Sequence, residues 1–417
     1  MINRSVPPGF SNQFKLTLPT PTTDVLANGI SLCWHKDVEQ EVTKIELVFH
    51  GGKWAEPKNG ISFFTATLFD KGTASKSAQQ IAEAFDQLGA QIECASGLDY
   101  LTISLYSLNR NLSLAWNLLT ELLTQATFPE AELAIQQSIQ IQNLKINNEK
   151  NSFVASKLLR KNIFGKNHPY GRFLEESDIT TQHAGALKKF FQGLTPSHVF
   201  ITGNIGESDF KSVTTFLEHY RSSSILTPSS VQKEEDRNQY IEKKESVQSA
   251  IRLGKIAPRN SDADFAGLLL LNHLLGGYFG SRLMKNIREE KGLTYGIYSS
   301  LNTFAHHGMF SVGAEVNKEN TSIALMEIFN EMKKLQEEAV TVAELTVVKN
   351  HLAGSLQLEL ANPFSVVDKL KNIHLNKLPA DYYDTLLENL QQSTPTDLQR
   401  LAQQYLSEDS MFRVTVG

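Results

Sequence analysis

Hydrophobic and polar residues follow two different periods along the chain. Apolar residues at every second position predict β-strands, as in residues 44–49, whereas apolar residues three and four positions apart predict amphipathic helices, as in residues 77–88. Asn28-Gly29 lies within residues 25–34 and predicts the turn of a β-hairpin there. The mixture of the two periods indicates an α+β protein.

The same order of elements occurs twice. In the first part of the chain the pattern predicts strands at 25–34, 44–49, 90–95, 100–106 and 199–203, and helices at 60–73, 77–88, 112–125, 129–148, 154–164, 181–191 and 209–219. In the second part it predicts strands at 249–253, 296–303, 308–316 and 412–416, and helices at 262–275, 281–290, 322–339, 342–360, 364–375 and 395–405. The recurrence predicts two homologous halves, each a mostly antiparallel sheet packed with helices.

Residues 221–240 separate the two parts. They are rich in serine and in charged side chains, which is typical of a linker. We therefore expect an N-terminal domain over residues 1–220, a linker over 221–240 and a C-terminal domain over 241–417.

Composition excludes several classes of protein. Hydrophobic residues make up 41% of the chain, charged residues 20%, and the net charge is −5, so no basic surface for nucleic acid is expected. No apolar run is long enough to span a bilayer, and the first residues lack the apolar core of a secretory signal. We expect a cytoplasmic protein, or a periplasmic one if the gene start is mis-set. Cys33 and Cys94 are expected as unpaired thiols, although the sequence leaves a disulfide between them open.

Short motifs occur in a characteristic order. They are Leu-Ala-Asn-Gly-Ile at 26–30, Gly-Gly-Lys-Trp-Ala-Glu-Pro at 51–57, the apolar segment 60–73, Leu-Gly-Ala at 88–90, Asp-Tyr at 99–100, Phe-Pro-Glu at 128–130, His-Pro-Tyr-Gly at 168–171, Leu-Gly-Gly-Tyr-Phe-Gly-Ser-Arg-Leu at 275–283 and Arg-Glu-Glu-Lys-Gly-Leu-Thr-Tyr at 288–295. With these motifs the chain resembles the M16 (pitrilysin, or insulinase-like) zinc peptidases, in their two-domain, mitochondrial-processing-peptidase-like branch. The resemblance runs nearly end to end and implies the metallohydrolase fold of the LuxS and processing-peptidase type.

The zinc motif of that family is absent from the chain. The family uses His-x-x-Glu-His on a helix, where two histidines on one face bind the metal and the glutamate acts as general base. By the resemblance, the two histidine positions fall on Phe63 and Thr67, the base falls on Ala66, and the distal ligand falls near Gln142 or Asn143. None of these residues is a good zinc ligand or base. We expect this chain to hold no catalytic zinc and to be inactive as a peptidase when alone.

A second pair of family residues is present. The resemblance implies that Arg288 and Tyr295 bind the substrate backbone and stabilise the tetrahedral intermediate at a zinc site. The alternative roles are a surface salt bridge for Arg288 and a place in the core for Tyr295. Gly276 and Gly277 are candidate substrate-contacting residues, or equally a helix break that permits a sharp turn. His306 and His307 have no acidic or thiol partner at ligand spacing and are expected in a solvent-exposed turn.

The zinc ligands are lost while the Arg/Tyr pair is retained, which predicts an enzyme whose active site is shared between two subunits. We expect a heterodimer with a homologous subunit that carries His-x-x-Glu-His and the zinc, while this chain supplies Arg288 and Tyr295 in trans and binds no cofactor itself. The substrates would be unfolded peptides. Two alternatives stay open: a structural M16 homologue without a protease partner, and a self-associating peptide-binding protein.

Overall fold

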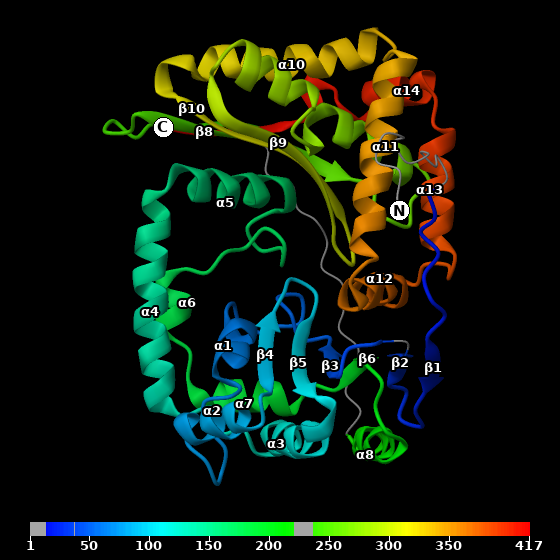
Figure 1. The fold of residues 1–417 in the computed structure, drawn as a ribbon. Coiled ribbons are helices and arrows are strands. Elements are labelled where there is room, and N and C mark those ends of the chain that lie inside the picture. Colours follow the sequence, from blue (N-terminus) through cyan, green and yellow to red (C-terminus); the bar gives the residue numbers. More distant parts are fainter. Residues whose placement is uncertain (1–13, 37, 221–236) are drawn as a thin grey trace, which may run out of the picture.

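The computed structural model describes residues 14–36, 38–220 and 237–417, so the predicted linker lies for the most part outside the described residues. Within this part of the chain the polypeptide forms two sheets, each covered by helices (Figure 1). No helix in the described ranges is both long and apolar enough to cross a membrane.

The first sheet has six strands in the order β1-β2-β6-β3-β5-β4. Asn28 and Gly29 turn the chain between β1 and β2, which pair antiparallel, and Gly29 has the positive φ of 86° that this turn requires. The pair β2–β6 is parallel and the pairs β6–β3, β3–β5 and β5–β4 are antiparallel. The strands are β1 (Thr22–Val25), β2 (Ser31–His35), β3 (Val42–Phe49), β4 (Gln91–Ser96), β5 (Leu101–Leu108) and β6 (Pro196–Thr202).

The second sheet has five strands in the order β7-β11-β8-β10-β9. Its first pair is parallel and the other three are antiparallel, so it repeats the arrangement β2-β6-β3-β5-β4 of the first sheet, strand for strand. This repeat confirms the two homologous α+β halves expected from the order of the elements. The strands are β7 (Asn238–Ile241), β8 (Gln248–Ala257), β9 (Thr294–Thr303), β10 (Gly308–Asn317) and β11 (Phe412–Val416).

Helices follow the strands in a matching order in both halves. Those of the first half are α1 (Ile61–Leu68), α2 (Ala78–Gln87), α3 (Leu112–Gln125), α4 (Glu130–Glu149), α5 (Asn151–Phe164), α6 (Glu176–Thr180), α7 (Ala184–Gln192) and α8 (Glu207–Glu218). Those of the second are α9 (Phe265–Asn272), α10 (Thr321–Glu337), α11 (Val342–Glu359), α12 (Pro363–Asn376), α13 (Tyr382–Gln392) and α14 (Pro395–Tyr405), with π-helical turns η2 (His273–Gly277) and η3 (Met284–Glu290).

The halves exchange one helix each. Helix α4 runs up one side of the molecule and places α5 on the second sheet, while α11 runs down the other side and places α12 on the first sheet (Figure 1). Leu159 of α5 packs with Val414 and other residues of the second sheet, and Val367 of α12 packs with Cys33 and Phe200 of the first. Because each exchanged helix buries apolar residues on the opposite half, the two halves form one unit.

Several helical boundaries differ from the expectations. The segment 60–73, expected as one helix, is helical only over α1 and ends at Leu68, and the helix expected at 154–164 begins at Asn151. The helix expected at 181–191 begins at Ala184, because the side chain of His183 accepts a hydrogen bond from the backbone N–H of Ala186 and caps the helix. The helices expected at 262–275 and 281–290 end in the π-helical turns η2 and η3. Helix α13 was not expected, although Tyr383, Leu386, Leu387 and Leu390 form its buried face at helical spacing.

Candidate functional site

Helix α1 contains Phe63, Ala66 and Thr67, the residues onto which the resemblance places the zinc motif. Its N-terminal residue Gly60 has a φ of 93°, a conformation that favours glycine. The carboxylate of Glu56 accepts hydrogen bonds from the backbone N–H groups of Gly60 and Ser62, at 3.0 and 3.2 Å, and from Arg172 at 3.0 Å. Burial raises the pKa of Glu56, while Arg172 opposes this shift. Glu56 therefore has a structural role, because it caps the N-terminus of α1.

The predicted metal-ligand positions hold no metal-binding group. Phe63 packs partly buried against the core of the first half and meets the fully buried Phe64 edge-on, with ring centroids 5.2 Å apart. Ala66 is 6% exposed, and the hydroxyl of Thr67 donates to the carbonyl of Phe63 at 2.9 Å. Asn143 is exposed on α4. These residues do not fit zinc, and no cluster of three or more histidine, cysteine, aspartate or glutamate side chains suited to a metal occurs among the described residues.

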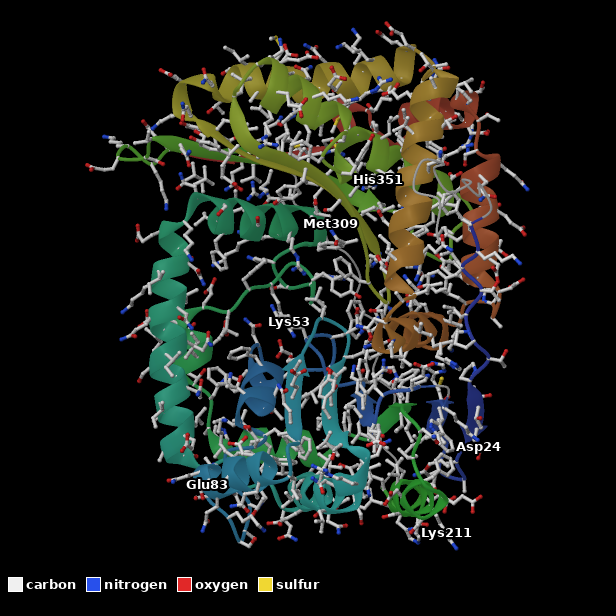
Figure 2. The ribbon with its side chains drawn as sticks, in the orientation of Figure 1. Asp24, Lys53, Glu83, Lys211, Met309 and His351 are labelled. Atoms are coloured by element: carbon white, nitrogen blue, oxygen red, sulfur yellow. The ribbon has the colours of Figure 1, made fainter. Side chains whose placement is uncertain are left out.

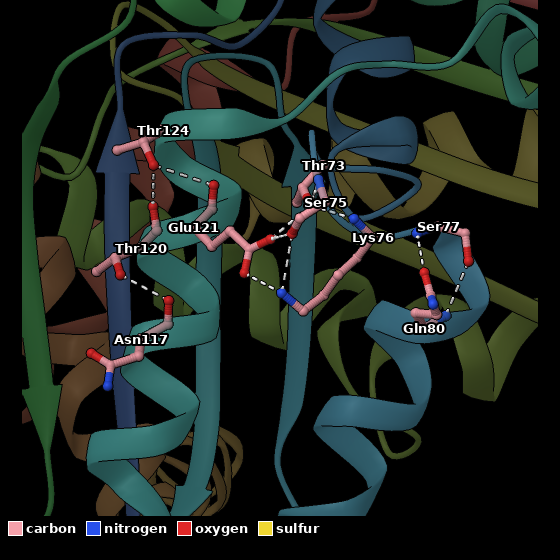
Figure 3. Close-up of polar contacts among 9 residues, drawn as sticks. All are labelled: Thr73, Ser75, Lys76, Ser77, Gln80, Asn117, Thr120, Glu121 and Thr124. Atoms are coloured by element: carbon pink, nitrogen blue, oxygen red, sulfur yellow. Dashed lines mark hydrogen bonds and ion pairs between the residues drawn. The ribbon is translucent and has the colours of Figure 1, made fainter.

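The loop after α1 is fixed by a polar network. Glu121 of α3 accepts hydrogen bonds from the hydroxyls of Thr73 and Ser75 at 2.7 and 2.6 Å, and from the ammonium of Lys76 at 2.5 Å (Figure 3). The bond from Lys76, followed by that from Ser75, lowers the pKa of Glu121 to about 2. The same loop leads into α2, where Ser77 and Gln80 form a capping box. This network thus ties the loop after α1 to α3.

In the second half, Gly276 and Gly277 end the π-helical turn η2 beside strand β9. A Cβ atom on Gly276 would lie 2.6 Å from the backbone nitrogen of Ser299, so only glycine permits this approach of η2 to β9. On Gly277 a Cβ would lie 3.0 Å from Nδ1 of His273. Both glycines therefore have a packing role, and they also line a pocket described below.

Tyr295 is the second residue of β9 and is 93% exposed. This exposure is incompatible with the alternative in which Tyr295 belongs to the core. Gly292, just before the strand, has a φ of 63° and turns the chain from η3 into β9. Strand β9 forms the edge of its sheet, so Tyr295 projects from a rigid edge rather than from a loop.

Arg288 lies in η3 and forms no salt bridge with any carboxylate in the described part of the chain, against the surface-salt-bridge alternative. Its guanidinium lies over the ring of Phe279, 4.6 Å from the centroid, in a cation–π contact. Phe279 is itself 64% exposed. The π-helical turn thus presents a cation that is positioned by an aromatic ring and forms no ion pair with the carboxylates of the described residues.

A pocket of about 660 Å³ brings most of the predicted residues together. Gly276, Gly277 and Tyr295 line it directly, whereas Arg288 is joined to it through Phe279. Its lining also includes Tyr278, Met284, Ile297, Tyr298 and Glu315. This volume lies in the range of about 300 to 1,000 Å³ that is typical of ligand-binding clefts.

Two histidines lie close to this pocket. His273 and His351 share a hydrogen bond of 2.9 Å between ring nitrogens, and Tyr278 stacks on His273 with centroids 4.7 Å apart. Burial, and then the neighbouring His351, lowers the pKa of His273 to about 4. The hydrogen-bonded pair His273 and His351 therefore lies directly behind the glycine turn, with His273 neutral near pH 7.

His306 and His307 lie in the turn between β9 and β10, as expected, but this turn contacts the first half. His306 stacks on Trp54 with ring centroids 4.0 Å apart, and His307 lies 5.7 Å from His168. His168 belongs to the motif His-Pro-Tyr-Gly, and its Nδ1 accepts a hydrogen bond from the backbone N–H of Tyr170 at 3.1 Å. The motif therefore builds the contact between the halves.

Comparison with known proteins agrees with the two-halved organisation of the chain. Residues 33–176 match the family model described as Insulinase (Peptidase family M16), and residues 186–352 match the one described as Peptidase M16 inactive domain. The chain belongs to peptidase family M16. It is similar to the uncharacterized zinc protease YmxG of Bacillus subtilis, with 28% identity over 360 residues, covering 84% of this chain and 87% of that protein.

Solved structures of this family share the fold. The peptidase M16 inactive domain from Pseudomonas fluorescens aligns with a TM-score of 0.88 and 24% identity, covering 96% of this chain and 98% of that one. A protease from Helicobacter pylori aligns with a TM-score of 0.84 and 18% identity, covering 96% and 99% of the two chains. Both comparisons confirm the two-halved M16 fold.

The sequence interpretation missed several residues at and near the pocket. Tyr298, Ser300 and Asn302 lie at every second position of β9 and therefore face the same side of the sheet. This two-residue period of polar side chains is visible in the sequence and could have indicated them. Asp99 and Trp54 lie in recognised motifs, but nothing in the sequence indicated that they meet the second half. Cys33 and Cys94 are both free thiols, and burial raises the pKa of Cys33 to about 12.

Proposed function

We propose that this chain is the zinc-less subunit of a two-subunit M16 peptidase. It binds the peptide and supplies Arg288 and Tyr295 to a homologous subunit that carries His-x-x-Glu-His and the zinc. The chain alone does not hydrolyse peptides.

The observation that carries this proposal is the contrast between the two halves. The positions for zinc ligands and base hold Phe63, Ala66 and Thr67, packed on or beside the core. Tyr295, in contrast, is 93% exposed at the edge of a pocket, where its hydroxyl is available to a group on another molecule. A protein that served only as a scaffold would gain nothing from an exposed tyrosine at a pocket whose Phe279 holds an arginine that has no carboxylate partner among the described residues.

The chemistry of the two side chains suits the proposed role. A tyrosine hydroxyl is a neutral donor whose hydrogen bond strengthens as negative charge develops on an acceptor oxygen, and a guanidinium offers several donors with a fixed positive charge. Donors held in place before the reaction require no reorganisation when the charge appears. The cation–π contact of Arg288 with Phe279, at 4.6 Å, supplies this positioning.

An edge strand is the natural place for the peptide. Strands β4 and β9 end their sheets, so each leaves one row of backbone donors and acceptors without a neighbouring strand in the described sheets. An extended peptide binds such an edge by main-chain hydrogen bonds, while pockets receive alternate side chains. Beside β9, the pocket of about 660 Å³ is available for this purpose.

The proposal is tested by measuring zinc content and peptide cleavage. Both are measured first for the isolated chain and then for its mixture with an M16 chain that carries His-x-x-Glu-His. The isolated chain should contain no stoichiometric zinc and cleave nothing, and the mixture should cleave. In the mixture, Tyr295→Phe should lower kcat by about a hundredfold, the typical cost of one such donor, and Arg288→Ala should also lower it strongly.

The matched control is Tyr240→Phe. Tyr240 is also a partly exposed tyrosine, but it lies on β7, at the opposite edge of the same sheet. This variant should leave cleavage by the mixture unchanged. Zinc-dependent cleavage by the isolated chain would refute the proposal, and so would a mixture whose rate is insensitive to Tyr295→Phe and Arg288→Ala. The second result would favour the structural or purely peptide-binding alternative.

A further inference from the structure

A second pocket lies between α5 and the face of the second sheet on which α5 packs. Its volume is about 270 Å³, just below the range of about 300 Å³ upward that is typical of clefts for larger ligands. Helix α5 contributes Ser156, Leu159 and Arg160, the turn after β9 contributes Phe304, and the sheet contributes Arg252, Tyr298, Asn302, Met309, Ser311, Val312 and Gly313. Figure 2 shows Met309 beneath the second sheet, near the end of α5.

On the sheet side, this pocket is lined by polar residues that are cross-strand neighbours. Tyr298 of β9 is paired with Gly313 of β10, which is paired with Arg252 of β8. A Cβ on Gly313 would lie 2.7 Å from the hydroxyl of Tyr298, so the ring lies across the glycine towards Arg252. In the next row the hydroxyls of Ser300 and Ser311 are 2.9 Å apart.

The two arginines of the pocket differ in their partners. Arg252 is 6% exposed and fully engaged: it donates to Ser156 at 3.0 Å, to Glu315 at 2.6 Å, and to backbone carbonyls. Arg160 has no hydrogen-bond acceptor and no ion-pair partner within the described ranges, and its Nε is buried without a partner. Arg160 is half-buried as a whole, but a buried Nε–H without an acceptor is unusual, because buried polar groups are normally hydrogen-bonded.

Aromatic contacts do not replace the missing acceptor. The guanidinium carbon of Arg160 lies 5.5 Å from the ring centroid of Phe173 and 5.8 Å from that of Phe304. Both distances are near the limit of about 6 Å for a cation–π contact. The five N–H groups of a guanidinium donate hydrogen bonds in the plane of the group, and the face of an aromatic ring does not replace acceptors there. Burial lowers the pKa of Arg160, so the charged form is held at a cost that an anion would offset.

The surroundings add positive charge. Lys53 lies between the two halves (Figure 2), with its ammonium 5.3 Å from the centroid of Phe173, the ring that Arg160 also contacts. Burial, helped by the charges of Arg160 and Arg172 and opposed by Glu56, lowers the pKa of Lys53 to about 8. An anion that entered beside Arg160 would therefore meet a favourable field from more than one cation.

We propose that the pocket between α5 and the second sheet binds a carboxylate of the bound peptide, with Arg160 as its charged partner and the hydroxyls of Tyr298 and Ser311 as neighbouring donors. A pocket of about 270 Å³ suits one residue rather than a segment. The carboxylate comes either from an acidic side chain or from the free C-terminus of a peptide, and the chemistry of recognition is the same.

The position of Tyr298 connects this subsite with the proposed function. Tyr298 lines both pockets, so a peptide that lies in the larger pocket beside Tyr295 has its continuation next to Arg160. The inference rests on the proposed function only in taking the ligand to be a peptide. It requires neither zinc nor a second subunit, and it is tested on the isolated chain.

The test is binding of three labelled hexapeptides to the isolated full chain, followed by fluorescence anisotropy. The first contains one glutamate and has an amidated C-terminus, the second replaces the glutamate by glutamine, and the third is the glutamine peptide with a free C-terminal carboxylate. Tighter binding of the first than of the second identifies an acidic side chain as ligand, and tighter binding of the third than of the second identifies the C-terminus. The expected preference is about tenfold or more, the usual worth of a charge-assisted hydrogen bond.

Arg160→Gln should abolish this preference and leave binding of the neutral peptide unchanged. Lys161→Gln is the matched control, because it removes one positive charge from the adjacent position on α5 without altering the pocket lining. Three results would each overturn the proposal. The unaltered chain could bind the three peptides equally, it could bind none of them, or the preference could survive Arg160→Gln. The comparison on the unaltered chain decides the matter even if Arg160→Gln does not fold. Inactivity of the mixture with a zinc-bearing chain would refute the proposed function and leave this result untouched.

Discussion

The carboxylate of Asp99 accepts a hydrogen bond at 3.0 Å from the backbone N–H of Ala305, which lies 206 residues later in the chain. The other oxygen of the same carboxylate accepts from the hydroxyl of Tyr170. The same turn carries His306, which stacks on Trp54. Asp99 thus joins two segments of the first half to the β9–β10 turn of the second half, which follows the strand that carries Tyr295 at its start.

Replacing Asp99 by alanine should destabilise the protein by about 3 kcal/mol, because two hydrogen bonds to a charged acceptor are lost and their donors are left inside the contact. Urea denaturation of the full chain measures the change. Asp86→Ala, at an exposed position of α2, is the control and should cost less than about 0.5 kcal/mol. Equal losses for the two variants would show that Asp99 does not hold the halves together.

Stability should fall on acidification between pH 6.5 and pH 4, in part because of His168. Burial, and then repulsion by His307, His306 and Arg172, lowers the pKa of His168 to about 4. Its Nε2 is buried and has no hydrogen-bond partner in the described part of the chain, so the folded protein holds the ring neutral. Below its ordinary pKa of 6.5 the unfolded chain takes up a proton that the folded chain refuses, and each pH unit then removes up to about 1.4 kcal/mol until the folded pKa is reached.

The measurement is the free energy of unfolding in urea at several pH values from 7 to 4. His168→Gln should reduce the slope, because the group that takes up the proton only on unfolding is gone. His219→Gln, on the exposed end of α8, should leave the slope unchanged. A slope that is the same in all three proteins would assign the acid sensitivity to other groups, of which His198 and His273 also have a pKa lowered to about 4.

Local features of the fold were predictable where one residue decides the conformation. Asn28-Gly29 allowed the hairpin to be predicted, and the degenerate character of α1 was readable from Phe63, Ala66 and Thr67 without coordinates. The exchange of α5 and α12 between the halves was not predictable from the sequence. An apolar face at helical spacing indicates that a helix packs on another element, but it does not indicate which of the two sheets that element is.

The same limit applies to the site. The sequence indicated Arg288 and Tyr295 as a pair, but the exposure of Tyr295 and the contact of Arg288 with Phe279 depend on how η3 meets β9. The subsite at Arg160 was not predictable, because its members come from α5, β8, β9 and β10, and the missing acceptor of Arg160 becomes visible only when every neighbour is known.

Restoring the base of the lost zinc motif should harm the protein. Ala66 is 6% exposed and belongs to the core cluster of the first half, so Ala66→Glu would bury a carboxylate without a partner. We expect a loss of about 3 kcal/mol or more in the free energy of unfolding. Ala82→Glu, on the exposed face of α2, makes the same change in a helix and should be nearly neutral. Comparable stability of the two variants would mean that α1 still has room for a catalytic group.

Gly313 is the position at which the proposed carboxylate subsite can be perturbed without changing any charge. A Cβ there would lie 2.7 Å from the hydroxyl and 2.8 Å from Cζ of Tyr298, so Gly313→Ala should force the ring off the strand and cost about 1 to 3 kcal/mol. Because the clash involves only that ring, Tyr298→Ala in the same chain should recover most of the loss. Gly296→Ala, where a new Cβ would meet nothing within 4 Å, is the control on the same sheet. A double-mutant cycle in urea measures the coupling, and strictly additive losses would contradict the placement of Tyr298 over Gly313.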